Sequence, residues 1–367
     1  MGNIVCLSTS NYHPYPTRKQ NVMNRIRAEE ILYFDPPVSY LAPLKDKSLR
    51  PRLKAWRRGG ERAGANITVY ALPPVLPFGN RYRWLNRLNQ RCQARYIRRV
   101  LARHGFDQPL LWCYSPTAAD LAGRLPHAGL VYDCVDRHSA YQGMLDPAMV
   151  DTMEKDLATQ ADQVFCTAAG LYDTLSQYNT QTALIPNGAA YALFAQAAGE
   201  KRREGPARFC FVGMLQDCIA YDYLLALAGA FPEAEIWLIG RVMPGVDIAP
   251  LTAKANIRLL GLQPQEELPR LIAQCDVCLN LFSPGRLSRD VSPLKFYEYL
   301  ATGKPLVSTA EPLQVRDYAE IVYIAEDIPD FLDKCGQALA EDDPALRQKR
   351  QEAGQAASWD NRVRQME

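Results

Sequence analysis

The sequence predicts an α/β protein built from two parallel-sheet domains. Short apolar runs of strand length alternate with helical patterns along the chain, and this alternation occurs twice. The break between the two series falls at Pro186-Asn187-Gly188, a turn-forming tripeptide. At 367 residues the chain is long enough for two such domains, and its 48% hydrophobic and 22% charged content is typical of a globular protein.

The first series predicts seven strands and five helices. The apolar runs expected to form strands are 3–8, 30–34, 67–71, 110–114, 129–133, 163–166 and 182–185. Helical patterns fall near 18–27, 81–104, 117–123, 149–160 and 168–178. The stretch 36–62 is rich in Pro and basic residues, and we expect a long loop or lid there.

Most of the positive charge lies in this first series. Between residues 45 and 103 there are sixteen Lys or Arg and two acids, although the formal net charge of the chain is only +2. In the helix expected at 81–104, arginines repeat at four-residue spacing, and an opposing apolar stripe is expected to face the core. The stripe consists of Trp84, Leu88, Cys92, Tyr96 and Val100.

This basic region, 50–103, predicts an anionic partner. No helix-turn-helix, zinc finger or aromatic RNA-binding motif accompanies the charge, so the pattern favours a membrane surface over nucleic acid. A merely solvated cationic face is the remaining alternative. No run of 18 apolar residues exists, and the ten cysteines lie mostly inside apolar runs, as reduced thiols do. We therefore expect a cytoplasmic protein at the inner face of the plasma membrane.

The second series predicts strands at 208–213, 235–240, 257–261, 276–282 and 305–308, with a helix from residue 220 and another near 292. The expected organisation is a first domain at 1–187, a second at 188–345 and a C-terminal helix at 346–367.

The helix near residue 292 carries the strongest functional signal. Ser292 is a suitable N-cap, Pro293 fits the first helical position and Gly303 suits the C-terminal stop. Lys295 then lies in the first turn, where the helix dipole disfavours a cation, so this end predicts an anionic ligand such as a phosphate. Glu298 lies one turn later and could accept hydrogen bonds from ribose hydroxyls. The alternative is an ordinary surface ion pair between Lys295 and Glu298.

Two acids eight positions apart, Asp290 and Glu298, precede Ala301-Thr302-Gly303-Lys304-Pro305, and this segment resembles the nucleotide-binding helix of GT-B glycosyltransferases. The resemblance implies two Rossmann-like domains that face a cleft, with the C-terminal helix crossing back to the first. It also implies that Asp290 contacts donor-sugar hydroxyls. Asp290 departs from the family pattern, which usually has Glu at that position.

In the first domain, Asp136 follows the strand expected at 129–133 and could act as a general base or as a loop-stabilising cap. His138 could serve instead as the base. The segments 15–21, 131–136 and 292–295 resemble those of xanthan glucuronosyltransferase-like and teichuronic-acid-type bacterial glycosyltransferases. The resemblance implies that Asp136 is the base and that Lys295 holds the nucleotide diphosphate. Arg18 and Lys19, with His138, are expected near the sugar or acceptor.

In the second domain, Gly213 and Met214 follow one strand and Arg241 follows the next. Glycine lets the backbone approach a ligand closely, and Arg241 is a second candidate for phosphate binding. The family's usual Lys after this glycine is absent, since Gln216-Asp217-Cys218 stands there. No DxD-type metal motif is present where it would be needed, so we expect neither a metal nor another cofactor.

These observations favour a glycosyltransferase that moves a sugar from a nucleotide-sugar, most simply a UDP-sugar, to a lipid-linked or polysaccharide acceptor. One alternative is a sugar-nucleotide epimerase or hydrolase of the same fold, which would leave the basic Trp-containing segments unexplained. The other is a degenerate scaffold protein without catalysis.

Overall fold

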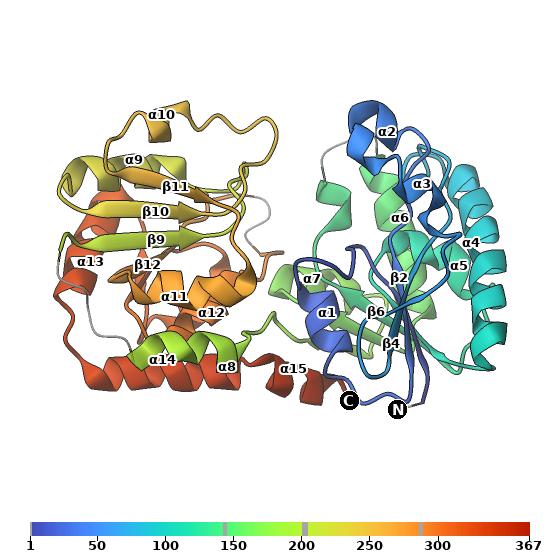
Figure 1. Ribbon diagram of the computed structural model, residues 1–367. Coiled ribbons are helices and arrows are strands. Elements are labelled where there is room, and N and C mark those ends of the chain that lie inside the picture. The colour runs from blue at the N-terminus through green and yellow to red at the C-terminus, as the bar shows by residue number, and fades with distance from the viewer. Residues whose placement is uncertain (1, 142–144, 200–204, 286–288) are drawn as a thin grey trace. The chain divides into compact units, whose positions relative to one another are not determined.

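The computed structural model describes residues 2–141, 145–199, 205–285 and 289–367 (Figure 1). The chain divides into two compact units. Unit 1 comprises Met1–Pro186 and Val363–Glu367, and unit 2 comprises Asn187–Arg362. The expected third segment, 346–367, is therefore divided, because only its last five residues group with unit 1.

Unit 1 is built on an eight-stranded sheet in the order β3-β4-β2-β1-β5-β6-β7-β8. All strands pair in parallel except β3, which pairs antiparallel with β4. The strands are β1 (Ile4–Leu7), β2 (Ile31–Asp35), β3 (Glu61–Arg62), β4 (Ile67–Ala71), β5 (Leu110–Cys113), β6 (Gly129–Cys134), β7 (Gln163–Cys166) and β8 (Thr182–Leu184). Seven of them are the predicted ones, since strands of a covered parallel sheet read as continuous apolar runs.

The helices of unit 1 include one long element and several short ones. They are α1 (Arg18–Met23), α2 (Ala42–Lys45), α3 (Arg52–Ala55), α4 (Arg83–His104), α5 (Ala119–Ala122), α6 (Pro147–Gln160) and α7 (Ala169–Leu175), with 3₁₀ turns η1 (Lys47–Leu49), η2 (Pro116–Ala118) and η3 (His138–Ala140). The stretch 36–62, expected to be a loop, thus contains short helical turns and the edge strand β3.

Over the first three turns of helix α4, the face that is buried is the one opposite to the face predicted to be buried. Trp84, Leu88 and Cys92, expected in the core, are exposed. The side chains that face inward are Asn86, Asn89, Gln90, Gln93, Ala94, Ile97, Val100 and Leu101. The predicted apolar stripe is therefore wrong except near its C-terminal end, because the buried amides find hydrogen-bond partners that the sequence does not reveal.

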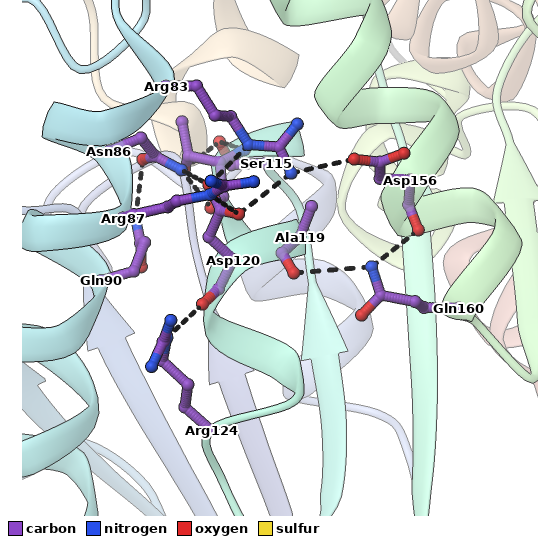
Figure 2. Close-up of polar contacts among 11 residues, drawn as sticks. Arg83, Asn86, Arg87, Gln90, Ser115, Ala119, Asp120, Arg124, Asp156 and Gln160 are labelled. Atoms are coloured by element: carbon purple, nitrogen blue, oxygen red, sulfur yellow. Dashed lines mark hydrogen bonds and ion pairs between the residues drawn. The ribbon is translucent and has the colours of Figure 1, made fainter.

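Asp120 of α5 is one of those partners (Figure 2). Asn86 donates to its carboxylate over 2.7 Å, and Arg83 forms a bidentate pair with it at 2.8 and 3.0 Å. Burial alone would raise the pKa of Asp120, but these donors hold that pKa below its usual value. Arg83 also reaches Asp156 of α6 at 2.9 Å (Figure 2). Part of the predicted cationic face is thus neutralised within unit 1.

Unit 2 is built on a six-stranded parallel sheet in the order β11-β10-β9-β12-β13-β14 (Figure 1). The strands are β9 (Arg208–Val212), β10 (Glu235–Ile239), β11 (Ile257–Gly261), β12 (Val277–Asn280), β13 (Leu306–Thr309) and β14 (Tyr323–Ala325). The helices are α8 (Tyr191–Phe194), α9 (Tyr221–Ala230), α10 (Ala249–Thr252), α11 (Leu268–Ala273), α12 (Leu294–Thr302), α13 (Ile328–Ala340), α14 (Pro344–Ala356) and α15 (Trp359–Met366), with 3₁₀ turns η4 (Ala195–Gly199), η5 (Gln265–Glu267) and η6 (Leu313–Tyr318). The part of α15 from Val363 onward belongs to unit 1.

Helices cover both faces of this second sheet. Phe209 and Phe211 of β9 belong to one hydrophobic cluster, which includes residues of α9, α10 and α13. Cys210 and Val212, which alternate with them, belong to another cluster with residues of α8, α11 and α12. This alternation follows from the two-residue period of a strand. The predicted fold class, two parallel-sheet α/β domains, is confirmed.

Candidate functional site

In each unit, the segments that follow the parallel strands leave the sheet at its carboxyl edge, which is where ligands bind in such sheets. In unit 1, α1 follows β1 in the chain, and Thr17 precedes its first residue. Gln20 Oε1 accepts hydrogen bonds from the backbone N–H and the hydroxyl of Thr17, at 2.8 and 2.7 Å. This closure of the first turn fixes Arg18 and Lys19, both of which are buried.

Arg18 is held almost completely by protein groups. Its Nε lies 2.9 and 3.0 Å from the two carboxylate oxygens of Asp133, at the end of β6. Its Nη1 donates to the carbonyls of Ile185 and Pro186, at 2.9 and 3.2 Å. Only Nη2 is buried without a hydrogen-bond partner among the described residues. Arg18 therefore joins α1, β6 and the end of unit 1, and among the described residues only the two N–H groups of its Nη2 are left for a ligand.

Lys19 lies in a cluster with the two predicted base candidates, Asp136 and His138. Burial lowers the pKa of the Lys19 ammonium, and the carboxylates of Asp136 and Asp133 partly oppose this shift. The Lys19 ammonium also lies 5.8 Å from the centre of the Tyr114 ring. Asp136 itself is half-buried and accepts a hydrogen bond of 2.9 Å from the hydroxyl of Tyr141. A partly accessible carboxylate can come within hydrogen-bond distance of a ligand hydroxyl, which a general base requires.

Several polar groups of this cluster are buried without a hydrogen-bond partner among the described residues. They are the hydroxyl of Tyr114, Nε2 of His138 and Nη2 of Arg18. A buried polar group without a partner costs about 1–3 kcal/mol, so such groups tend to be satisfied by a ligand or by water. Tyr114 follows β5 directly, and nothing in the local sequence beyond that position distinguishes it.

Burial lowers the pKa of His138 from its usual 6.5 to about 4, and the Lys19 ammonium acts in the same direction, whereas Asp136 and a backbone hydrogen bond at Tyr114 oppose it. The unfolded chain takes up a proton near pH 6.5, but the folded protein stays neutral at His138 until about pH 4. The free energy of unfolding is therefore expected to fall by about 2–3 kcal/mol between pH 6.5 and 4.5 through this one group. Thermal unfolding of the wild type and of His138→Gln across this range would measure it. Parallel pH dependences of Tm in the two proteins would contradict the expectation.

In unit 2, two glycines bring neighbouring strand ends into backbone contact. Gly213 follows β9 and Gly240 follows β10, and the N–H of Gly213 donates to the carbonyl of Ile239 over 2.9 Å. A Cβ atom at Gly240 would lie 1.8 Å from the carbonyl oxygen of Gly213. Met214 and Arg241, the next residues, are both exposed. This turn thus presents backbone and two accessible side chains at the carboxyl edge of the sheet.

Replacing Gly240 by Ala is expected to displace the Gly213 turn, because no flexible side chain is available to absorb the contact. The overpacking is expected to cost about 1–3 kcal/mol or more and to lower Tm. Gly229→Ala is the matched control, since a Cβ there meets nothing within 4 Å and lies in α9. Equal Tm values for the two variants would contradict this account of the turn.

Lys295 lies in the first turn of α12, as predicted, but its ion pair with Glu298 is not a surface pair. The two side chains are 2.6 Å apart, with Lys295 28% exposed and Glu298 0% exposed. Glu298 also accepts a hydrogen bond of 3.1 Å from Gln265. Burial raises the pKa of Glu298, and Lys295 and Gln265 limit the rise. Lys295 lies 5.7 Å from the centre of the Phe194 ring, which further confines it.

Tyr299 connects this helix to the glycine turn. Its hydroxyl accepts a hydrogen bond of 2.6 Å from the backbone N–H of Val212, the residue before Gly213. Tyr299 lies one turn beyond Lys295 on α12. Its hydrogen bond therefore connects the helix that carries Lys295 to the turn at Gly213. Neither Tyr299 nor Gln265 was predicted, because nothing in the local sequence distinguishes them from core or surface residues.

Ser292 was predicted to cap α12, and this prediction is wrong. The helix begins at Leu294, Pro293 occupies the cap position and no side chain caps the first turn. Ser292 instead contacts Asn187, whose backbone N–H donates to its hydroxyl over 3.0 Å and whose amide donates to its carbonyl over 2.8 Å. Asp290 is buried nearby in sequence. The prediction that α12 ends at Gly303 is correct, and φ there is 72°.

Unit 1 also contains a cavity of about 460 Å³. Segments that follow β2, β4 and β5 and the inward face of α4 line it, with one basic side chain, Lys45, and no acid. It does not include the Asp136 cluster.

Among the described residues, no three His, Cys, Asp or Glu side chains gather as a metal site would require. No helix in the same part of the chain combines the length and apolar character that crossing a membrane requires.

Comparison with known proteins agrees with the predicted resemblance. Residues 224–367 match a family described as glycosyl transferase-like. A putative teichuronic acid biosynthesis glycosyltransferase of Bacillus subtilis is 22% identical over 278 residues, 70% of either chain. Sucrose-phosphate synthase from Thermosynechococcus elongatus has a TM-score of 0.71 at 16% identity over 100% of this chain and 97% of its own. An Anabaena protein, HepE, solved in complex with UDP, has a TM-score of 0.65 at 16% identity over 100% and 98%. The solved structures show that the fold is GT-B.

Proposed function

We propose that this GT-B glycosyltransferase moves a sugar from a UDP-sugar to a lipid-linked or polysaccharide acceptor at the cytoplasmic surface of a membrane. The observation that carries the proposal is the ion pair between the partly exposed Lys295 and the buried Glu298 at the start of α12, a helix whose first turn has no side-chain cap. A partly exposed ammonium in the first turn of a helix without a side-chain cap is suited to a diphosphate. The resemblance to a protein whose structure contains UDP supports uracil as the base.

The donor would bind with its diphosphate at Lys295 and the start of α12. Gly213 and Met214 would lie against the nucleotide, Arg241 would supply a second cation, and Asp290 would contact the donor sugar. In the structure both oxygens of Glu298 are occupied, by Lys295 and Gln265. When Lys295 turns to the diphosphate, Oε2 of Glu298 becomes free to accept a hydrogen bond from a ribose hydroxyl. We therefore expect donor binding to break the ion pair between Lys295 and Glu298.

Asp136 would act as the general base. Its carboxylate takes the proton from an acceptor hydroxyl, the hydroxyl oxygen bonds to the anomeric carbon, and the bond from that carbon to the diphosphate breaks. UDP leaves with the bonding electron pair, and the positive groups at α12 stabilise its charge without a metal ion. Tyr141 orients the base, since its hydroxyl donates to Asp136.

The cluster around Lys19 favours an acidic sugar over a neutral one. Lys19, Nη2 of Arg18 and the hydroxyl of Tyr114 offer N–H and O–H donors, and the last two have no hydrogen-bond partner among the described residues. A carboxylate on the transferred or accepting sugar would accept from them. A glycuronosyl transfer therefore fits unit 1 better than a plain hexosyl transfer.

The test is release of UDP from UDP-glucuronate, UDP-glucose and UDP-N-acetylglucosamine, measured with and without membrane lipid extract and with EDTA. We expect turnover of one donor that requires the lipid fraction and persists in EDTA. Consumption of the donor without any acceptor would favour an epimerase or hydrolase. Absence of turnover with every donor, in a protein that also fails to bind UDP, would favour the scaffold alternative.

A further inference from the structure

Helix α4 presents apolar side chains on the face where a solvated helix carries polar ones. Trp84 is 65% exposed and Leu88 is 39% exposed. We define the docking face as the exposed side chains on this side of the helix, which are Trp84, Leu88, Arg91, Cys92, Arg95, Arg98 and Arg99. An exposed group of large apolar residues on one face marks an interaction site more often than isolated ones do.

The inward face of α4 holds the helix in this orientation. Asn89 accepts a hydrogen bond from the backbone N–H of Leu76 over 2.8 Å and donates to its carbonyl over 3.0 Å. Gln93 donates to the carbonyl of Pro73 over 2.9 Å. Rotating the helix to bury Trp84 would break these bonds and leave buried amides unpaired, which is unfavourable. The outward position of Trp84 and Leu88 is therefore fixed by the packing of unit 1.

The charges of the docking face are unopposed. Helix α4 contains seven arginines and no acid. Arg83 and Arg87 pair with Asp120, on the side of the helix toward α5 (Figure 2). The arginines of the docking face form no ion pair with any residue that the structure describes. Arginines that flank exposed Trp and Leu are typical of helices in a membrane interface, where the apolar residues enter the acyl boundary and the guanidinium groups meet phosphates.

We propose that α4 lies in the plane of an anionic membrane surface, with Trp84 and Leu88 inserted and Arg91, Arg95, Arg98 and Arg99 at the headgroups. This inference rests on the proposed membrane-surface function and specifies the element that performs the docking. Leu44 of α2, 80% exposed, is a further candidate for insertion. Helix α2 and the inward face of α4 both line the cavity of unit 1. A lipid-linked acceptor in a membrane that contacts α4 would therefore lie next to this cavity.

Cys92 provides a direct test, because it is the exposed member of the ten cysteines and only Cys218 among the others is partly accessible. An environment-sensitive fluorophore such as NBD would be attached at Cys92 in a Cys218→Ser background. With vesicles of phosphatidylcholine and phosphatidylglycerol we expect a blue shift and quenching by doxyl-labelled lipids. Vesicles of phosphatidylcholine alone should give little of either. No spectral change on the mixed vesicles would overturn the proposal.

Trp84→Gln/Leu88→Gln is expected to lower the vesicle partition coefficient roughly tenfold, because two inserted side chains lose their apolar contact. Leu259→Gln/Leu262→Gln, at exposed positions of unit 2, is the matched control and should bind like the wild type. Equal losses in both variants, or binding to poly(U) RNA in place of vesicles, would overturn the docking face. If vesicle binding fails while UDP still raises Tm, this inference fails and the proposed transferase function stands.

Discussion

Replacing Asp136 by Asn is expected to lower kcat by about 10²–10⁴ while leaving UDP affinity unchanged. The amide keeps the shape of the side chain and can still accept the hydrogen bond from Tyr141, but it cannot take up a proton from the acceptor. Steady-state kinetics with the active donor, together with calorimetric titration of UDP, would separate the two effects.

Tyr141→Phe is the informative companion to Asp136→Asn. It removes the hydrogen bond to the carboxylate but keeps the base, so its loss of kcat should be much the smaller of the two. His138→Gln tests the alternative base in the same assay. Retention of activity within tenfold in Asp136→Asn, or a larger loss in His138→Gln, would contradict the assignment of Asp136.

Replacing Lys295 by Ala is expected to damage both stability and donor binding. Glu298, fully buried, would lose its counterion and keep only the hydrogen bond from Gln265 among the described residues. Breaking such a buried pair costs about 3–5 kcal/mol, and the lower end applies because Lys295 reaches solvent. For a unit of this size that corresponds to a fall in Tm of roughly 6–12 °C.

The double variant Lys295→Ala/Glu298→Gln separates the two effects. A neutral amide at 298 no longer needs a counterion, so most of the lost Tm should return. The affinity for UDP should stay low, because the cation that meets the diphosphate is still missing. A double variant that regains both Tm and UDP affinity would show that Lys295 is a structural residue only.

The strands were predictable because both covered sheets bury their strands on two faces, which leaves continuous apolar runs in the sequence. Two short strands were missed: both residues of β3 are exposed, and of the three residues of β14 only Ala325 is buried. Helix α4 was predicted with the wrong face inward. Its buried amides bond to the backbone of residues 73 and 76 and to Asp120, which lie 13 to 34 positions from the amides and outside any helical period.

The positions of the site residues could be predicted from the sequence, but the contacts between them could not. Residues after strand ends, such as Asp136, Gly213 and Arg241, can be located from the alternation of elements alone. The Arg18–Asp133 pair joins residues 115 positions apart, and no local pattern predicts it. Similarly, Gln265 lies 33 positions from Glu298, so the burial of that carboxylate became evident only in the folded chain.

Thermal unfolding with UDP, GDP, ADP and CMP, in the wild type and in Lys295→Ala/Glu298→Gln, tests the central claim most directly. A ligand at 100 times its dissociation constant stabilises a protein by about 2.7 kcal/mol, which a Tm measurement resolves. We predict that UDP alone raises Tm of the wild type and that the double variant does not respond. A wild type that responds to none of the four nucleotides, or a double variant that responds equally to UDP, would contradict the claim that α12 holds a UDP-sugar.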